Sequence, residues 1–233
     1  ADARVIWGGD RTIAEIQECS LPPRAVEIAF ADRYSVAIIN ADDYLNADQD
    51  WEQIARQFYN DTYLTDQNAC TSPRMMIWTG SRREEAKRIF WAQLYEILEK
   101  EYSLQDKQVV DKLTNQYLLS TLGKEYHIIP TVDNYLTRVQ IKEPTADWMN
   151  QKGNSGFFFE YDWNSWEQLL PLFSNTACQT ISYYGDISGL KETLLQGVRG
   201  VDRIVPIGST MDFDLIWDGY DLYEWLTRSV VWG

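Results

Sequence analysis

Short apolar runs alternate along the chain with amphipathic stretches of helical period. Apolar or alternating runs predict strands at 4–7, 26–30, 35–39, 74–79, 127–130, 135–141, 157–161, 180–184 and 203–207. Helical spacing predicts helices at 12–19, 51–63, 81–102, 105–122, 165–173 and 187–196. The alternation of the two predicts an α/β fold, with a largely parallel sheet flanked by helices.

Two of the predicted helices begin with capping signals. Asp50 precedes the helix at 51–63, and Ser81 stands three residues before Glu84, which is a capping-box pattern. The helix that follows Ser81 has one apolar stripe, and we expect this stripe to face the core. It consists of Ile89, Phe90, Leu94, Ile97 and Leu98.

Composition limits the kinds of partner that the protein can bind and the compartments in which we expect it. The chain has 233 residues and a net charge of −14, so it lacks the basic surface that binds nucleic acid or anionic membranes. No apolar run approaches the ~18 residues of a membrane span. Three cysteines form no disulfide framework, and their odd number points to a reducing compartment. With no signal peptide pattern at the start, we expect a cytoplasmic protein.

The clearest candidate for chemistry is Cys70. It stands in the polar stretch 66–74 (Asp-Gln-Asn-Ala-Cys-Thr-Ser-Pro-Arg), between a predicted helix and a predicted strand. A thiol in such a loop can act as a nucleophile, and a guanidinium such as Arg74 favours the thiolate if it turns inward. The alternative that Cys70 is chemically inert is also compatible with the sequence at this point. Cys19, on the apolar side of a helix, and Cys178, at a strand start, are interpreted as structural.

His127 is the only histidine of the chain. This argues against a Ser-His-Asp hydrolase and against a zinc site, and we predict no metal. A papain-like pair of Cys70 and His127 stays open, because such partners need only be close in space.

Gly8 and Gly9 form a turn between the first predicted strand and the first predicted helix. Such a turn can bring backbone N–H groups to a phosphate, although a plain strand-to-helix turn reads the same way. A chain that opens at once on a buried strand is expected to be the middle of a domain.

Five blocks carry a family resemblance in the expected order. They are residues 5–9 (Val-Ile-Trp-Gly-Gly), 32–35 (Asp-Arg-Tyr-Ser), 66–74, 200–208 (Gly-Val-Asp-Arg-Ile-Val-Pro-Ile-Gly) and 217–222 (Trp-Asp-Gly-Tyr-Asp-Leu). They resemble the C-terminal half of the aldehyde dehydrogenase superfamily. More closely, they resemble the long-chain fatty-acyl-CoA reductases of bacterial luminescence systems.

This resemblance implies reduction of a fatty acyl thioester to a fatty aldehyde. Cys70 matches the catalytic cysteine, which accepts the acyl group from acyl-CoA or from an acyl-transfer partner enzyme. NADPH then delivers hydride to the thioester carbonyl. The backbone N–H of Cys70 is expected to stabilise the oxyanion. Gly8 and Gly9 match the turn that passes near the cofactor, and a homo-oligomer is compatible with the resemblance.

The sequence departs from the superfamily pattern in two places. No general-base glutamate stands around 30–33, which suits acyl reduction better than oxidation of an aldehyde to an acid. The Glu-x-Phe-Gly-Pro block that holds the nicotinamide ribose has no match around 151–159. The aromatic residues there, 157–159, suit either an acyl tunnel or the core, and core packing is the commoner role.

The resemblance also implies a division of the chain. Residues 1–31 are expected to be the C-terminal edge of a nucleotide-binding domain, and residues 32–233 the cysteine-bearing catalytic domain. Most of the nucleotide-binding domain would then lie upstream, so we expect a fragment that neither binds NADPH well nor turns over alone. The alternative is a non-catalytic interaction or acyl-transfer domain that keeps the fold.

Overall fold

The computed structural model describes residues 1–46 and 48–233, and these fall into two compact units. The larger unit comprises residues 34–211, and the smaller unit comprises residues 1–33 together with 212–233. Within the described ranges, no helix is both long enough and apolar enough to cross a membrane.

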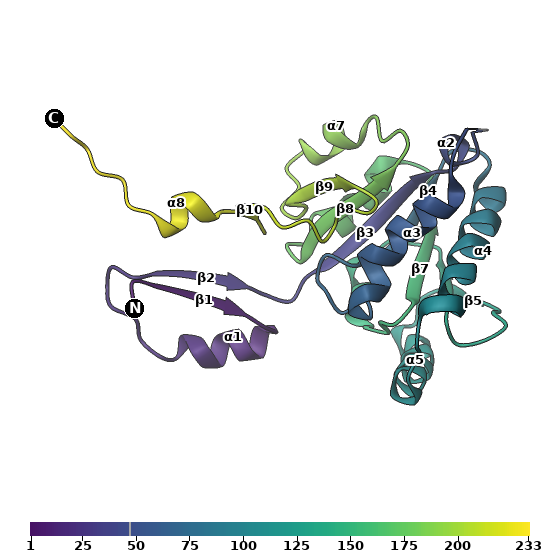
Figure 1. Cartoon of the computed structure of the whole chain (residues 1–233), viewed down its shortest axis with the longest axis horizontal. Helices are drawn as coiled ribbons and strands as arrows, with labels where there is room; N and C mark the ends of the chain where they lie inside the picture. The colour runs from purple at the N-terminus through teal and green to yellow at the C-terminus, as the bar shows by residue number, and fades with distance from the viewer. Residues whose placement is uncertain (47) are drawn as a thin grey trace. The chain divides into compact units, whose positions relative to one another are not determined.

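The larger unit is built on a seven-stranded sheet with helices on its faces (Figure 1). Its strands are β3 (Tyr34–Asn40), β4 (Pro73–Thr79), β5 (Tyr126–Ile129), β6 (Thr137–Ile141), β7 (Phe157–Asp162), β8 (Cys178–Tyr184) and β9 (Arg203–Pro206). They lie in the order β5-β6-β7-β4-β3-β8-β9, and β5 is antiparallel to β6 while the other neighbours are parallel. The predicted α/β fold with a largely parallel sheet is confirmed.

The connections of this unit are helical. The α-helices are α2 (Ala41–Tyr44), α3 (Trp51–Thr62), α4 (Arg83–Glu101), α5 (Asp106–Leu119), α6 (Leu170–Phe173) and α7 (Leu190–Leu194). The 3₁₀ segments are η1 (Tyr63–Thr65), η2 (Ser120–Leu122), η3 (Ala146–Asn150) and η4 (Trp166–Leu169).

Two hydrophobic cores lie on opposite faces of the sheet, because successive side chains of a strand point to opposite sides. In β4, Met76 and Trp78 belong to the core that includes α3 and α4, whereas Met75 and Ile77 belong to the other core. The stripe of α4 packs into the first core as predicted. The aromatic residues 157–159 are fully buried in the two cores, which confirms the packing interpretation.

Helix α3 begins after Asp50, whose carboxylate accepts a hydrogen bond from the Gln53 N–H, as predicted. The capping box predicted at Ser81 is wrong. The Asp42 carboxylate accepts the N–H groups of Ser81 and Arg82, and Arg82 precedes α4 without a side-chain cap. A carboxylate 39 residues away in sequence thus holds the turn that leads into α4, and the Ser81 hydroxyl donates to it.

The smaller unit pairs the two ends of the chain. It contains β1 (Ala3–Trp7), α1 (Asp10–Gln17), β2 (Val26–Phe30), β10 (Ile216–Trp217), β11 (Tyr220–Asp221) and α8 (Leu222–Leu226). β1 and β2 are parallel, and Trp217 joins Ile28 and Phe30 in a small core. The structure divides the chain after residue 33 and again before residue 212, and Trp217 packs with β2 in the smaller unit. The expected assignment of residues 1–31 to a nucleotide-binding domain and of 32–233 to a catalytic domain stays a prediction.

Lys112 of α5 is 1% exposed, and its Nζ donates to the carbonyl oxygens of Ser155 (2.9 Å) and Asn134. Burial lowers its pKa from the ordinary 10.5 to about 8. Between about pH 8 and about pH 10 the unfolded chain therefore holds a proton that the folded chain has lost, so the free energy of unfolding should rise with pH. The upper limit is about 1.4 kcal/mol per pH unit. Urea unfolding across this range measures the slope.

Lys112→Met is expected to flatten this rise, whereas Lys107→Met, on the exposed side of the same helix, should leave it unchanged. An equal slope in Lys112→Met and in the parent protein would contradict the assignment.

Candidate active site

Cys70 is half-buried in the loop between η1 and β4. The predicted position between a helix and a strand is confirmed. The loop is anchored to the rest of the unit, because its two sides and its centre each form hydrogen bonds with other elements.

The start of the loop docks on the segment that leads into β7. Asp66 and Gln67 are both left-handed, with φ of 52° and 57°, and so are Asn154 and Ser155, with φ of 49° and 48°. The Ser155 N–H donates to the Asp66 carbonyl (2.9 Å), and Asn154 Nδ2 donates to Asn68 Oδ1 (2.7 Å). Two backbone segments in the left-handed conformation are therefore joined by direct hydrogen bonds.

Gln67 completes this joint with its side-chain amide, which is fully buried. Its Nε2 donates to the carbonyls of Pro73 (2.8 Å) and Phe157 (3.1 Å). Its Oε1 accepts the N–H groups of Gly156 (3.0 Å) and Phe157 (3.1 Å). One side chain thus satisfies four buried backbone groups at the starts of β4 and β7. Gly156 has φ of 89°, and a Cβ there would collide with the Tyr135 carbonyl.

The backbone at Cys70 itself is held at the amino ends of β3 and β8. Ser35 Oγ donates to the Cys70 carbonyl oxygen (2.7 Å) and accepts the Thr180 N–H (3.3 Å). The Ser72 N–H closes a turn onto the Ala69 carbonyl (3.0 Å). The backbone around the thiol is therefore fixed against the sheet.

The segment after β9 returns to the same loop. Thr71 Oγ1 donates to Met211 Sδ (3.1 Å). The Asp61 carboxylate, at the end of α3, accepts the N–H groups of Gly208 (2.7 Å) and Thr210 (3.1 Å). The block 200–208, quoted above for its resemblance, thus leads into a segment that contacts the cysteine loop.

Arg74 follows the loop and is 5% exposed. It occupies a β-bulge, because Ser35 pairs with Pro73 while the next residue, Val36, pairs with Met75. Burial lowers the pKa of the Arg74 guanidinium, and its interaction with Cys70 raises it. The Arg74 side chain is thus turned inward, which is the condition stated above for an influence on Cys70.

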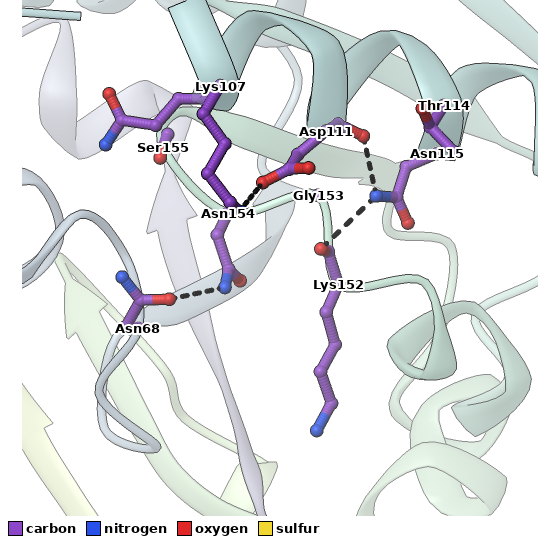
Figure 2. A pocket seen from close by; sticks show the side chains of 10 residues that line it. Asn68, Lys107, Asp111, Thr114, Asn115, Lys152, Gly153, Asn154 and Ser155 are labelled. Atoms are coloured by element: carbon purple, nitrogen blue, oxygen red, sulfur yellow. Dashed lines mark hydrogen bonds and ion pairs between the residues drawn. The ribbon is translucent and has the colours of Figure 1, made fainter. Parts of the chain in front are cut away.

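A polar hollow of about 440 Å³ is lined by Asn68, by residues of α5 and by residues 152–155 (Figure 2). Figure 2 shows the Asn68–Asn154 contact, the ion pair of Lys107 with Asp111, and Asn115 bonded to the Lys152 carbonyl. Amides and ion-paired side chains line this space, which does not suit a long acyl chain.

Gly8 and Gly9 lie in the smaller unit, between β1 and α1. The Gly8 N–H donates to the Phe30 carbonyl (3.3 Å), and Gly9 is the residue that precedes α1. A Cβ at Gly8 would lie 3.3 Å from Thr12, whereas nothing lies within 4 Å of a Cβ at Gly9. The strand–turn–helix arrangement is as predicted, and the role of the turn in cofactor binding stays a prediction.

The other candidate residues fall outside the site. His127 is exposed on β5, three strands away from β4, which amounts to ~14 Å at ~4.8 Å per strand. A hydrogen-bonded pair of Cys70 and His127 is therefore wrong. Cys178 is buried at the start of β8 as predicted, but Cys19 is exposed, because α1 ends at Gln17. Residues 1–46 and 48–233 contain no cluster of three or more side chains suited to a metal.

Sequence reasoning missed the roles of Ser35 and Gln67. Both stand in blocks quoted for the resemblance, 32–35 and 66–74, so a signal was present. Their hydrogen-bond partners, however, lie up to 145 residues away in sequence, and only the fold reveals them.

Solved structures with a similar fold are aldehyde dehydrogenases. Betaine aldehyde dehydrogenase from Staphylococcus aureus has a TM-score of 0.60 at 10% identity, over 88% of this chain and 44% of that one. Aldehyde dehydrogenase 21 from Physcomitrella patens has 0.61 at 11%, over 90% and 45%. A variant of aldehyde dehydrogenase C from Pseudomonas syringae, complexed with NAD⁺ and octanal, has 0.58 at 11%, over 88% and 45%. This chain spans less than half the length of each.

The family comparison covers the cysteine loop. No curated protein matches the chain. The family model described as acyl-CoA reductase (LuxC) matches residues 1–130, which is more than half of the chain and includes Cys70. The match agrees with the aldehyde dehydrogenase fold of the solved structures. On this basis the chain belongs to the acyl-CoA reductase (LuxC) family.

Proposed function

We propose that this chain carries the acyl-accepting step of an acyl-CoA reductase, with Cys70 as the nucleophile. The observation that carries the proposal is the placement of Cys70, a half-buried thiol whose loop is fixed on both sides. A nucleophile held in one geometry avoids the entropy cost of being positioned during the reaction.

In the proposed step, Cys70 Sγ attacks the carbonyl carbon of a fatty acyl thioester. The acyl donor is acyl-CoA or an acylated partner protein. A new S–C bond forms, the bond from the carbonyl carbon to the donor sulfur breaks, and the departing thiolate takes up a proton. Negative charge develops on the carbonyl oxygen during this step, and the Cys70 N–H is the proposed donor to it.

A nicotinamide cofactor, when bound, supplies the hydride that reduces the acyl-cysteine thioester to an aldehyde. We propose NADPH as this cofactor, with Gly8 and Gly9 forming the turn beside it. Support comes from the open space around Gly9. Because the chain spans less than half the length of the similar dehydrogenases, we propose that it needs further protein for hydride transfer.

The experiment is covalent labelling in a reducing, cytoplasm-like buffer. The chain is incubated with a radioactive long-chain acyl-CoA and digested, and the labelled peptide is identified. We expect label on the Cys70 peptide, released by neutral hydroxylamine as a thioester would be. Cys70→Ala should abolish it, and Cys19→Ser, which removes the exposed thiol, should retain it.

Equal labelling of Cys70→Ala and of the parent chain would refute the nucleophile. Label on Cys70 without aldehyde, after NADPH and the complete reductase are supplied, would instead favour the acyl-transfer interpretation.

A further inference from the structure

Arg74 differs from other arginines of low exposure in lacking a carboxylate partner. The Arg138 side chain, 14% exposed, pairs with Glu160 (2.5 Å), and the Arg33 side chain, 12% exposed, pairs with Asp218 (3.6 Å). Arg74 is more buried, yet among the described residues it forms no ion pair, and its Nε has no hydrogen-bond partner.

A buried guanidinium without a counter-charge is costly, by several kcal/mol in an apolar environment. Arginine does not escape this cost by losing its proton, since its ordinary pKa exceeds ~12. An anion close to Arg74 would offset this cost.

The carboxylates of the surrounding elements are occupied by other donors. Asp61 of α3 accepts two backbone N–H groups, and Asp66 after η1 accepts the Tyr102 hydroxyl (2.7 Å). Arg203 of β9, a cation, donates to the Thr210 carbonyl (3.0 Å).

Cys70 is the titratable group that the fold brings to Arg74. The turn closed by Ser72 joins the two residues, and Ser35 links them, since it bonds the Cys70 carbonyl and pairs with Pro73. The bulge at Arg74 is the kind of irregularity that redirects a side chain beside a site. The electrostatic interaction of Arg74 with Cys70 agrees with this placement.

We propose that Arg74 is a positioning residue that holds Cys70 as a thiolate. The thiol proton passes to solvent, and the guanidinium and the sulfur then serve as each other's counter-charge. This inference rests on the proposed role of Cys70 as the nucleophile. It adds the reason why that thiol is reactive, and it explains the burial of Arg74.

The test follows the alkylation of Cys70 by iodoacetamide, which reacts with the thiolate, from about pH 5 to about pH 10. Parent, Arg74→Gln and Arg74→Lys proteins are compared in a Cys19→Ser background, and modification is read on the Cys70 peptide. We expect the pH profile of Arg74→Gln to shift upward, with alkylation near pH 7 slowed about tenfold for a shift of one pH unit. Arg74→Lys, which keeps the charge, should lie closer to the parent.

The rate near pH 10, where the thiolate predominates in every variant, is the control for loop structure. Equal profiles for Arg74→Gln and the parent would overturn the proposal, and so would a uniform slowing at all pH values. If Arg74→Gln does not fold, Arg74→Lys is the deciding variant. Because lysine keeps the charge, an upward shift of its alkylation profile by about one pH unit, the shift expected for loss of the charge, would contradict the ion pair.

Acyl labelling of the same proteins separates this inference from the proposed function. A shifted alkylation profile with no acyl label on Cys70 would sink the reductase step and leave the ion pair standing. Normal acyl labelling with unshifted alkylation profiles would instead support the reductase step and overturn the ion pair.

Discussion

Glu160→Ala is expected to lower the free energy of unfolding by about 3–5 kcal/mol. Glu160 is fully buried on β7, and its carboxylate accepts from Arg138 Nε (2.5 Å), Trp78 Nε1 (2.9 Å) and Trp91 Nε1 (3.1 Å). Alanine would leave one buried cation and two buried indole N–H groups without their acceptor. Urea unfolding of the parent and the variant measures the loss.

A matched control is Glu101→Ala, which removes an exposed pair with Arg56 and should cost far less, because water and salt screen an exposed ion pair. The double variant Glu160→Leu with Arg138→Met should recover part of the loss, because it removes both buried charges together. A cost for Glu160→Ala no greater than for Glu101→Ala would show that the buried network contributes little.

Gln67→Leu is expected to cost about 3–4 kcal/mol and to disturb the cysteine loop. Leucine has a similar size but cannot pair with the four backbone groups at Pro73, Gly156 and Phe157, and each lost bond costs on the order of 1 kcal/mol. Because these bonds hold the starts of β4 and β7 together, alkylation of Cys70 near pH 10 should also change. Unfolding and alkylation are measured on the same samples.

The control is Asn68→Ala, one residue further along the loop. Asn68 is exposed, and within residues 1–46 and 48–233 its side chain makes one hydrogen bond, with Asn154, so its loss should cost less than about 1 kcal/mol. If Gln67→Leu were as stable as Asn68→Ala, the buried amide would not be what fixes the loop.

Local sequence information predicted the elements whose signals are local. β3 and β4 each contain an uninterrupted apolar run, at 36–39 and 75–78, and they match their predicted ranges within a residue or so at each end. Helix α3 follows its Asp50 cap. The cap of α4 was mispredicted because Asp42, remote in sequence, engages both the hydroxyl and the N–H of Ser81, and α4 begins only at Arg83.

For the candidate site, too, the sequence predicted what depends on local signals and missed what depends on residues remote in sequence. The position of Cys70 was readable from a polar loop between apolar segments, and the family blocks strengthened it. The supports of that loop were not readable, because Ser35 and Gln67 act on partners brought in by β8 and β7. Likewise, an exposed Cys19 follows from where α1 ends, at Gln17, which periodicity alone did not fix.

The joint between residues 66–67 and 154–157 makes the cysteine loop part of a larger cooperative unit. A loop that moved independently would open without disturbing the sheet, at little cost in free energy. Here the N–H groups of Gly156 and Phe157 are bonded to Gln67, so releasing the loop also frees the first residues of a central strand. Local opening at Cys70 therefore costs part of the free energy of unfolding the sheet. We expect the acyl substrate to adjust its position to the thiol, while the loop keeps its conformation.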